Sequence, residues 1–317
     1  MNFHALFSQF GLYTVTGLAQ GAIIALFALG YTLVYGVLRL INFAHSEVFM
    51  LGTFAAIGIW GAFGYTENSS LPGLGMLILL LFVAFIAAMA ASGTAAVFVE
   101  LVAYRPLRRR NAPPLAFLIT AIGVSLVLQE VVGVIFTHRN PVGIPVLISP
   151  KPVFHIGKTP VNATQILLIV LALVMMFVLD RFVNQTRYGR GIRAVAQNPD
   201  SAALMGVNKN RVISLVFLLG GLMAGIAAVM YDLKIGNAKY DDGFLLGLEA
   251  FTAAVLGGIG NLRGALVGGL TLGVVEYWGG AVFGSQYQRV VAFVVLIVIL
   301  MFRPTGILGE SLGRARA

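Results

Sequence analysis

Long runs of apolar residues, separated by charged or turn-forming residues, follow one another along this 317-residue chain. A helix rises 1.5 Å per residue and the hydrocarbon layer is about 30 Å thick, so a membrane span needs about 20 apolar residues. Runs of about this length occupy residues 12–38, 44–64, 74–100, 115–136, 164–182, 212–232, 265–283 and 288–302. The pattern predicts an all-α integral membrane protein built as a polytopic helical bundle. No Lys or Arg precedes Arg39, so we expect the first run to be a retained span and not a cleaved signal.

A further apolar segment, residues 246–260, is shorter and less regular than the others. It contains Glu249 and ends in several glycines. Such a segment is typical either of a complete span or of a broken or re-entrant helix that lines a polar route. The sequence therefore predicts eight or nine spans.

Residues 187–211 form a basic, helix-prone island between two apolar runs. Each charge costs roughly 2.5–3.5 kcal/mol at the centre of a bilayer, so this island must lie in water. We predict one helix as far as Gln197 and a second that Asn198 caps and Pro199 begins, with Gly206 just after its end. Residues 202–205 would then offer apolar side chains to a partner protein. A generic basic loop, the alternative interpretation, would need neither the Asn-Pro break nor this apolar face.

Lys and Arg are unevenly divided between the two sides of the predicted bundle. One side receives 15 of the 21, namely Arg39, four at residues 105–110, six at 181–211, Arg263 and three from Arg303 onward. The other side receives Arg139, Lys151, Lys158, Lys234, Lys239 and Arg289. Because cytoplasmic loops carry the excess of positive charge, we predict that the first side is cytoplasmic. The loop 138–162 on the other side contains five prolines and is expected to be an extended extracytoplasmic cap.

The composition excludes several functional classes. Only 10% of the residues are charged, against roughly 25% in soluble domains, and 59% are hydrophobic. The net charge of +9 is explained by the Lys and Arg residues that gather in loops on one side of the membrane, so nucleic acid is not an expected partner. The chain has no cysteine, which excludes disulfides, thiolate metal sites and thiol catalysis. We expect no catalytic residue, metal site or cofactor.

Four polar residues, Asn42, His45, Ser46 and Glu47, lie together between two apolar runs. In one interpretation they form the cytoplasmic turn between the first two spans. Asn42 or Ser46 then caps the second span, and the charge of Glu47 interacts favourably with the positive end of that helix's dipole. In the other, a break in the helix exposes them to a translocation path. The sequence leaves both interpretations open.

A second polar set, Glu249, Asn261, Arg263 and Glu276, lies among glycines near the C-terminal spans. Glu276 precedes Tyr277 and Trp278, so we expect it at the membrane interface within an aromatic belt. The candidate residues for a translocation path are Asn42, His45, Glu47, Glu249 and Asn261.

Many of the 38 glycines recur at four-residue spacing, as in the pairs at 17 and 21, 221 and 225, 260 and 264, 264 and 268, and 269 and 273. Small residues at this spacing let helix backbones approach closely inside a membrane. We expect these glycines to pack helices within one bundle. The alternatives are an interface between subunits or a helix that slides during transport.

Three motifs carry a resemblance to a known family. They are GYTLVYGVLRLINFAHSEVFMLG from Gly30, GIRAVAQNPDSAALMGV from Gly191, and AAVLGGIGNLRGALVGGLTLGVVE from Ala253, with FRPTGILG near the end. In this order they resemble the LivH-type permeases of branched-chain amino acid ABC importers, and the resemblance runs across nearly the whole chain. The family usually has glycine after the histidine of INFAH, where this chain has Ser46. That departure leaves the substrate open among branched-chain or other hydrophobic amino acids, short amides and urea.

The resemblance implies a single permease domain, residues 1–317, with the architecture of a type II-like ABC importer and a broken helix lining its path. It implies multi-pass insertion in the lipid bilayer of a bacterial inner membrane. It also implies a second homologous permease subunit, two cytosolic ATPase subunits whose ATP hydrolysis drives import, and an extracytoplasmic substrate-binding protein. The chain itself would not be an enzyme. An ion-coupled secondary transporter or channel, acting through His45, Glu47 or Glu249, is the alternative.

In the family scheme, residues 187–207 form a cytosolic coupling segment that docks on the ATPases. The corresponding residues of this chain are Arg190, Arg193, Gln197, Asn198, Pro199, Asp200, Ala202, Ala203, Leu204 and Gly206.

Overall fold

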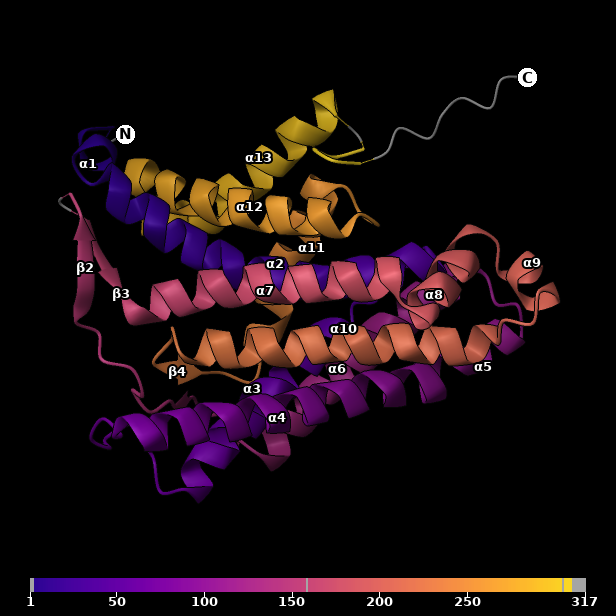
Figure 1. Cartoon of the computed structure of the whole chain (residues 1–317), viewed down its shortest axis with the longest axis horizontal. Coiled ribbons are helices and arrows are strands. Elements are labelled where there is room, and N and C mark those ends of the chain that lie inside the picture. The colour runs from indigo at the N-terminus through magenta and orange to yellow at the C-terminus, as the bar shows by residue number, and fades with distance from the viewer. Residues whose placement is uncertain (1–2, 158, 304, 310–317) are drawn as a thin grey trace.

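Helices make up most of the chain in the computed structural model, which describes residues 3–157, 159–303 and 305–309 (Figure 1). The α-helices are α1 (Phe3–Ser8), α2 (Phe10–Leu38), α3 (His45–Ala62), α4 (Leu74–Val99), α5 (Arg105–Arg109), α6 (Pro114–Ile135), α7 (Ala163–Gln185), α8 (Arg187–Gln197), α9 (Pro199–Leu204), α10 (Lys209–Asp232), α11 (Asp242–Gly257), α12 (Leu262–Phe283) and α13 (Gln288–Phe302). A π-helical segment, η1 (Glu100–Tyr104), joins α4 to α5, and a 3-10 turn, η2 (Ser285–Tyr287), precedes α13. Lys158, Arg314 and Arg316, which enter the count of basic residues above, lie outside the described part.

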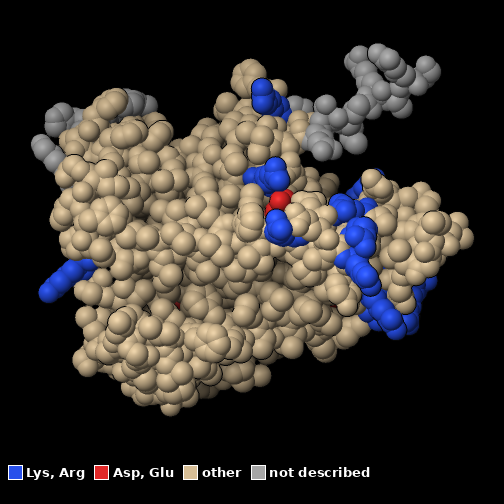
Figure 2. Space-filling model, viewed as in Figure 1, with Lys and Arg blue, Asp and Glu red and all other residues tan. Residues whose placement is uncertain are grey.

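Four short strands lie at one end of the bundle (Figure 1). Strand β2 (Pro152–Ile156) pairs with β3 (Thr159–Asn162), and β1 (Val142–Gly143) pairs with β4 (Asn237–Ala238), both antiparallel. The loop 138–162 is thus largely extended, as expected, but it also contains strand pairs that its proline content did not predict. We call this end the strand end. We call the opposite end, where Lys and Arg gather around α5 and α8, the basic end (Figure 2).

All the apolar runs of the sequence are helical, which confirms a mostly helical membrane protein. Seven helical stretches of the described residues are long and apolar enough to cross a membrane: Phe10–Leu38, Leu74–Arg109, Pro114–Ile135, Ala163–Gln185, Lys209–Asp232, Leu262–Phe283 and Ser285–Phe302. Helices α3 and α11, of 18 and 16 residues, are not among them. The total of eight or nine spans stays a prediction.

Helix α2 lies at the centre of the bundle, with α7, α10, α11 and α12 around it. It is largely apolar on every side, as expected of a helix enclosed by others, and its residues 21–34 are buried. Glycines make its contact with α12 close: a Cβ on Gly21 would lie 2.6 Å from the carbonyl oxygen of Gly269. Gly221 and Gly225 meet α4 in the same way. These glycines pack helices within the bundle, as expected.

Helix α3 begins inside the bundle and not at the end of α2. The ring of His45 lies 5.2 Å from that of Phe27 and 4.9 Å from that of Tyr31. Helix α2 continues beyond Tyr31 to Leu38, so residues 39–44 must turn back along it by about 10 Å. Helix α11 begins at the same level, because a Cβ on Gly243 would lie 2.7 Å from the carbonyl oxygen of Ser46.

Candidate translocation path and docking segment

A central polar cluster forms where α3 and α11 begin. Asn42, His45, Ser46 and Glu47 are at most 3% exposed. Ser125 of α6 donates a hydrogen bond to Oε1 of Glu47 over 3.1 Å. The structure therefore brings three of the five candidate path residues together at one place.

The expectation that Asn42 or Ser46 caps the second span is wrong. Helix α3 starts after Ala44 without a side-chain cap. Oδ1 of Asn42 instead accepts a hydrogen bond from the Tyr104 hydroxyl over 2.9 Å, and Oγ of Ser46 donates to the carbonyl oxygen of Phe43 over 2.6 Å. The hydrogen bonds of both side chains therefore hold the segment that turns back into the bundle, and neither side chain caps α3.

Three buried polar atoms of the central cluster have no hydrogen-bond partner among the described residues: Oε2 of Glu47, Nε2 of His45 and the hydroxyl of Tyr31. Buried polar groups are normally paired, so each such atom needs an explanation. The first turns of α3 and α11 meet here, and helix N-termini carry partial positive charge. The cluster thus combines unpaired donors and acceptors with aromatic rings, an arrangement suited to a small polar solute with an apolar part.

A second cluster lies between α11, α12 and α13, and it corrects the prediction for Glu276. That residue is 4% exposed, so it is not part of an aromatic belt on the surface of the bundle. Its carboxylate interacts electrostatically with Glu249, Lys234 and Arg289, because it lies inside the chain where α12 packs against α11. Arg289 donates a hydrogen bond to Glu249 over 2.7 Å. Glu249 is therefore part of an ion cluster separate from Glu47.

Lys234 connects this cluster to α2. Its Nζ donates to the hydroxyl of Tyr277 over 3.1 Å and to Gln20, and it lies 5.1 Å from the centre of the Tyr277 ring. Burial lowers the pKa of Lys234 to about 8.

Asn261 lies at the basic end and stabilises the start of α12. Its side chain accepts hydrogen bonds from the backbone of Arg263 and Gly264 and donates to the carbonyl oxygen of Leu308 over 2.9 Å. It also borders a cavity of about 840 Å³. The charged and polar side chains that line this cavity are Tyr35, Arg39, Asp180, Asn184, Arg193, Asn261, Arg263 and Thr305.

The basic island folds as two short helices, α8 and α9, as predicted. Oδ1 of Asn198 accepts hydrogen bonds from the backbone N–H of Asp200 and Ser201, over 3.0 and 2.9 Å, and Pro199 is the first residue of α9. Gly206 follows the helix with a φ of 83°, a left-handed conformation that glycine adopts without strain.

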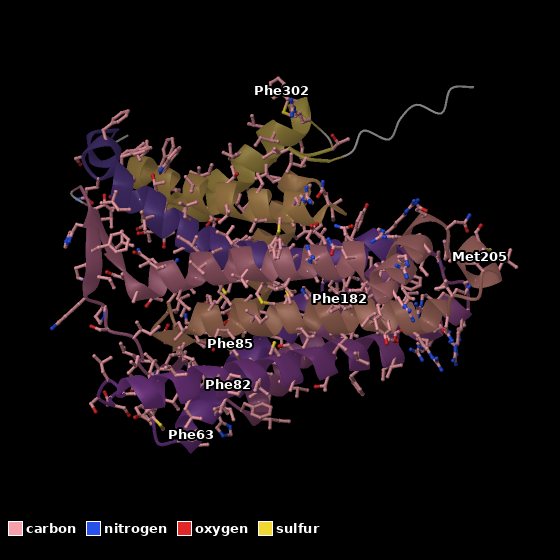
Figure 3. The ribbon with its side chains drawn as sticks, in the orientation of Figure 1. Phe63, Phe82, Phe85, Phe182, Met205 and Phe302 are labelled. Atoms are coloured by element: carbon pink, nitrogen blue, oxygen red, sulfur yellow. The ribbon has the colours of Figure 1, made fainter. Side chains whose placement is uncertain are left out.

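The apolar face of α9 differs in one residue from the expected one. Ala202 is only 5% exposed within this chain, so it is not available to a partner. Leu204 and Met205 are 88% and 85% exposed, and Met205 projects from the tip of the molecule (Figure 3). The remaining candidate docking residues on the surface of the island are Arg190, Arg193, Gln197, Asn198, Pro199, Asp200, Ala203 and Gly206.

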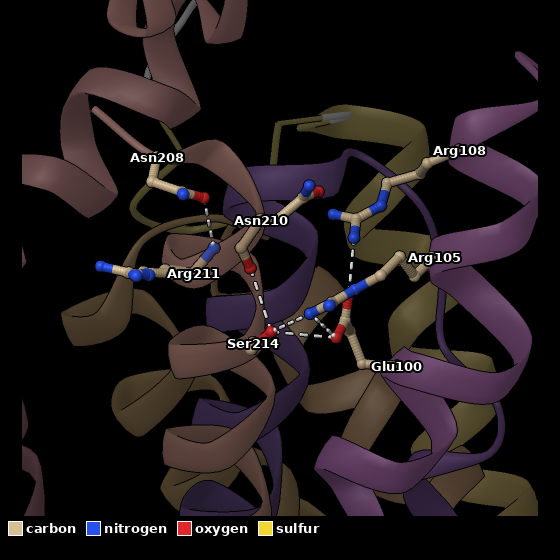
Figure 4. A network of polar contacts seen from close by, with 7 residues as sticks. All are labelled: Glu100, Arg105, Arg108, Asn208, Asn210, Arg211 and Ser214. Atoms are coloured by element: carbon tan, nitrogen blue, oxygen red, sulfur yellow. Dashed lines mark hydrogen bonds and ion pairs between the residues drawn. The ribbon is translucent and has the colours of Figure 1, made fainter. Parts of the chain in front are cut away.

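One ionic network at the basic end was missed from the sequence (Figure 4). Glu100, which is fully buried, accepts hydrogen bonds from Arg105 over 2.9 and 3.2 Å, from Arg108 over 2.5 Å and from Ser214 of α10 over 3.0 Å. The network joins the π-helical segment η1 to the first part of α10. Its only sequence signal is a carboxylate just before a group of arginines.

The comparisons with known proteins identify the family. The family model described as "Branched-chain amino acid transport system / permease component" matches residues 13–300. This chain belongs to that family. The permease is 43% identical over 301 residues to the high-affinity branched-chain amino acid transport system permease protein BraD of Pseudomonas aeruginosa, covering 93% of this chain and 94% of that protein.

Other relatives match the permease to different extents. LivH of Escherichia coli, with the same descriptive name as BraD, is 38% identical over 297 residues, again covering 93% of this chain. The fructose import permease protein FrcC of Rhizobium meliloti is 29% identical over 153 residues, or 46% of this chain. No solved structure matches the permease. The relatives are named as transport permeases and not as enzymes.

Proposed function

We propose that this permease is the membrane subunit of an ATP-driven importer of branched-chain or other hydrophobic amino acids. The observation that carries the proposal is the full-length identity to BraD, 43% over 93% of the chain. The basic end would lie in the cytoplasm and the strand end outside, in agreement with the positive-inside rule. The partners would be a second, homologous permease, two ATPases at the basic end and a substrate-binding protein at the strand end.

The exposed tip of α9 supports docking of an ATPase. Leu204 and Met205 are neighbouring large apolar side chains that are almost fully exposed, and adjacent exposed apolar side chains are typical of a protein contact surface. Arg193 of α8 donates a hydrogen bond to the carbonyl oxygen of Val183 and lines the cavity at the basic end. A shift of the docked segment would therefore change the shape of that cavity directly.

The proposed path follows α2. Tyr31 belongs to the central cluster, and Tyr35, Gly36 and Arg39 line the cavity at the basic end. In this scheme α3 and α11 are broken helices whose first turns meet at the path, and Glu47 and His45 contact the amino acid as it passes. Glu249 and Asn261 would act on the structure around the path and not on the substrate.

Uptake of radiolabelled leucine by cells that lack the gene, with and without a plasmid copy, tests the function. We expect restored uptake that competes with isoleucine and valine and stops when ATP is depleted. Competition only by urea or short amides would contradict the amino acid assignment. Uptake that survives ATP depletion but stops with a protonophore would favour an ion-coupled transporter.

A pull-down tests the docking surface. Leu204→Asp should abolish co-purification of the ATPases, because it places a charge in the apolar contact. Ser201→Asp adds the same charge to the first turn of the same helix, where acidic residues are tolerated, and should retain them. Loss of the ATPases in both variants, or in neither, would contradict the assignment.

A further inference from the structure

A cavity of about 300 Å³ lies near the strand end, between α2, the first turn of α7, the segment 144–150 and the residues around the end of α10. Its volume is at the lower limit of the roughly 300–1,000 Å³ typical of small-molecule sites. Thr16 and Ala19 line it from α2, about 20 Å along that helix from Tyr31. The cavity is thus separate from the central cluster, and the surface is hollowed between the strand-end parts of α7 and α10 (Figure 2).

Asp232, the last residue of α10, supplies a carboxylate to this cavity. It is 1% exposed, and neither of its carboxylate oxygens has a hydrogen-bond partner among the described residues. Buried carboxylates are normally paired with a cation or with several donors. Lys234 also borders the cavity, but its ammonium group is bonded to Tyr277 and Gln20. Asp232 is therefore free to accept hydrogen bonds from an ammonium group in the cavity.

The part of the lining that α7 supplies favours a negative group. Asn162, Thr164 and Gln165 line the cavity at the start of α7, a helix of 23 residues. A capping box between Asn162 and Gln165 uses the N–H groups of these two residues, so the N–H groups of Ala163 and Thr164 and the helix dipole remain to attract a carboxylate. Nε2 of Gln165 donates to Oγ1 of Thr16 over 3.2 Å, so side chains of α2 and α7 are held together at this wall.

The rest of the lining is aliphatic. Ile144, Leu147, Ile148 and Leu168 border the cavity, and the first two are each 3% exposed. At the rim, Val146 is 51% exposed, so the cavity reaches the surface of the strand end. A carboxylate, a helix N-terminus and an aliphatic wall match the ammonium group, the carboxylate and the side chain of an aliphatic amino acid.

We propose that this cavity is an acceptor site for an aliphatic amino acid zwitterion at the strand end, upstream of the central cluster. Asp232 binds the α-ammonium group, the first turn of α7 binds the α-carboxylate, and the residues of segment 144–150 contact the side chain. The site rests on the proposed import function, because an importer receives its substrate at this end. It gives the substrate a first position in the permease before the central cluster.

A single introduced cysteine tests occupancy directly, because the chain contains none. Leucine should protect Val146→Cys at the rim from a maleimide in membranes that hold the complete complex. Val153→Cys on β2, 63% exposed and outside the cavity lining, should label equally with and without leucine. Analogues that lack the carboxylate or the amine, 3-methylbutylamine and 4-methylpentanoate, should protect less well.

Asp232→Asn tests the ammonium contact. In the Val146→Cys background it should raise the leucine concentration for half-protection about 10- to 100-fold, as expected when a hydrogen-bonded charge partner is lost. The same variant should raise the leucine concentration for half-maximal uptake. Glu130→Gln changes an exposed carboxylate and should have no effect. Ile148→Trp, which fills the cavity and keeps the carboxylate, should abolish protection even if Asp232→Asn does not accumulate.

Uptake by the wild type separates the two proposals. A complex that imports no amino acid would overturn the proposed function. Import without leucine protection of Val146→Cys, or protection that survives both Asp232→Asn and Ile148→Trp, would overturn the acceptor site and leave the import function intact.

Discussion

Removing the carboxylate of Glu100 should destabilise the basic end strongly. This side chain is fully buried and accepts hydrogen bonds from Arg105, Arg108 and Ser214, while Arg105 also donates to Ser214 over 2.7 Å. Glu100→Ala leaves two guanidinium groups side by side without their counter-charge. Loss of one partner from a buried ion pair costs about 3–5 kcal/mol; the arginine side chains are 24% and 16% exposed, so water compensates in part and we expect about 2–4 kcal/mol.

Reversible unfolding in mixed micelles of a mild detergent and dodecyl sulfate measures this free energy. Glu130→Ala is the matched control, because its ion pair with Arg139 is as short, at 2.6 Å, but both side chains are more than half exposed. Exposed pairs contribute at most about 1 kcal/mol. A cost for Glu100→Ala no larger than that of the control would refute the view that this network holds η1 against α10.

Three further changes test other parts of the structure. Gly269→Ala would place a Cβ 2.5 Å from Cα of Ala25 and should cost about 1–3 kcal/mol of unfolding free energy, whereas Gly123→Ala, with open space around it, should be neutral or stabilising. Burial lowers the pKa of Lys234 from 10.5 to about 8, so the folded protein binds this proton less tightly than the unfolded chain. The unfolding free energy of the wild type should therefore rise between pH 8 and 10.5 relative to Lys234→Met, and parallel curves for the two would contradict this linkage. Asn198→Ala removes the cap of α9 and should lower hydrogen-exchange protection there about fivefold, a loss of about 1 kcal/mol, while α7 stays unchanged.

Much of the fold could be predicted because the bilayer imposes simple rules. The lengths of the apolar runs predicted the long helices. The Asn198–Pro199 pair and Gly206 predicted the two ends of α9, since caps depend only on local residues. The depth in the bundle at which α3 begins could not be predicted. The segment after Leu38 turns back into the bundle, and the local sequence carries no information on depth.

The candidate sites were predictable only where the chemistry is local. His45 and Glu47 are two residues apart in the sequence and lie in the same buried cluster in the structure. The prediction that Glu276 belongs to a surface aromatic belt was wrong because it relied on the neighbours Tyr277 and Trp278, whereas the burial of Glu276 depends on which face of α12 meets α11. Asp232 was not predicted as a site residue, because it ends an apolar run, as residues at a membrane surface do. Only packing against α2, α7 and the loop 144–150 makes that carboxylate unusual.

The central place of α2 has a consequence for how the chain is made. Helix α2 emerges first among the long helices, yet Gly21 meets Gly269, a residue 248 positions later in the chain. Ribosomes add about 5–20 residues per second, so this face of α2 waits on the order of 10–50 s for α12. Because the face is apolar and glycine-rich, lipid can cover it during that interval. Closure of the bundle around its first long helix is therefore a late event in biogenesis, and a chain truncated before Leu262 should leave that face open to lipid crosslinkers.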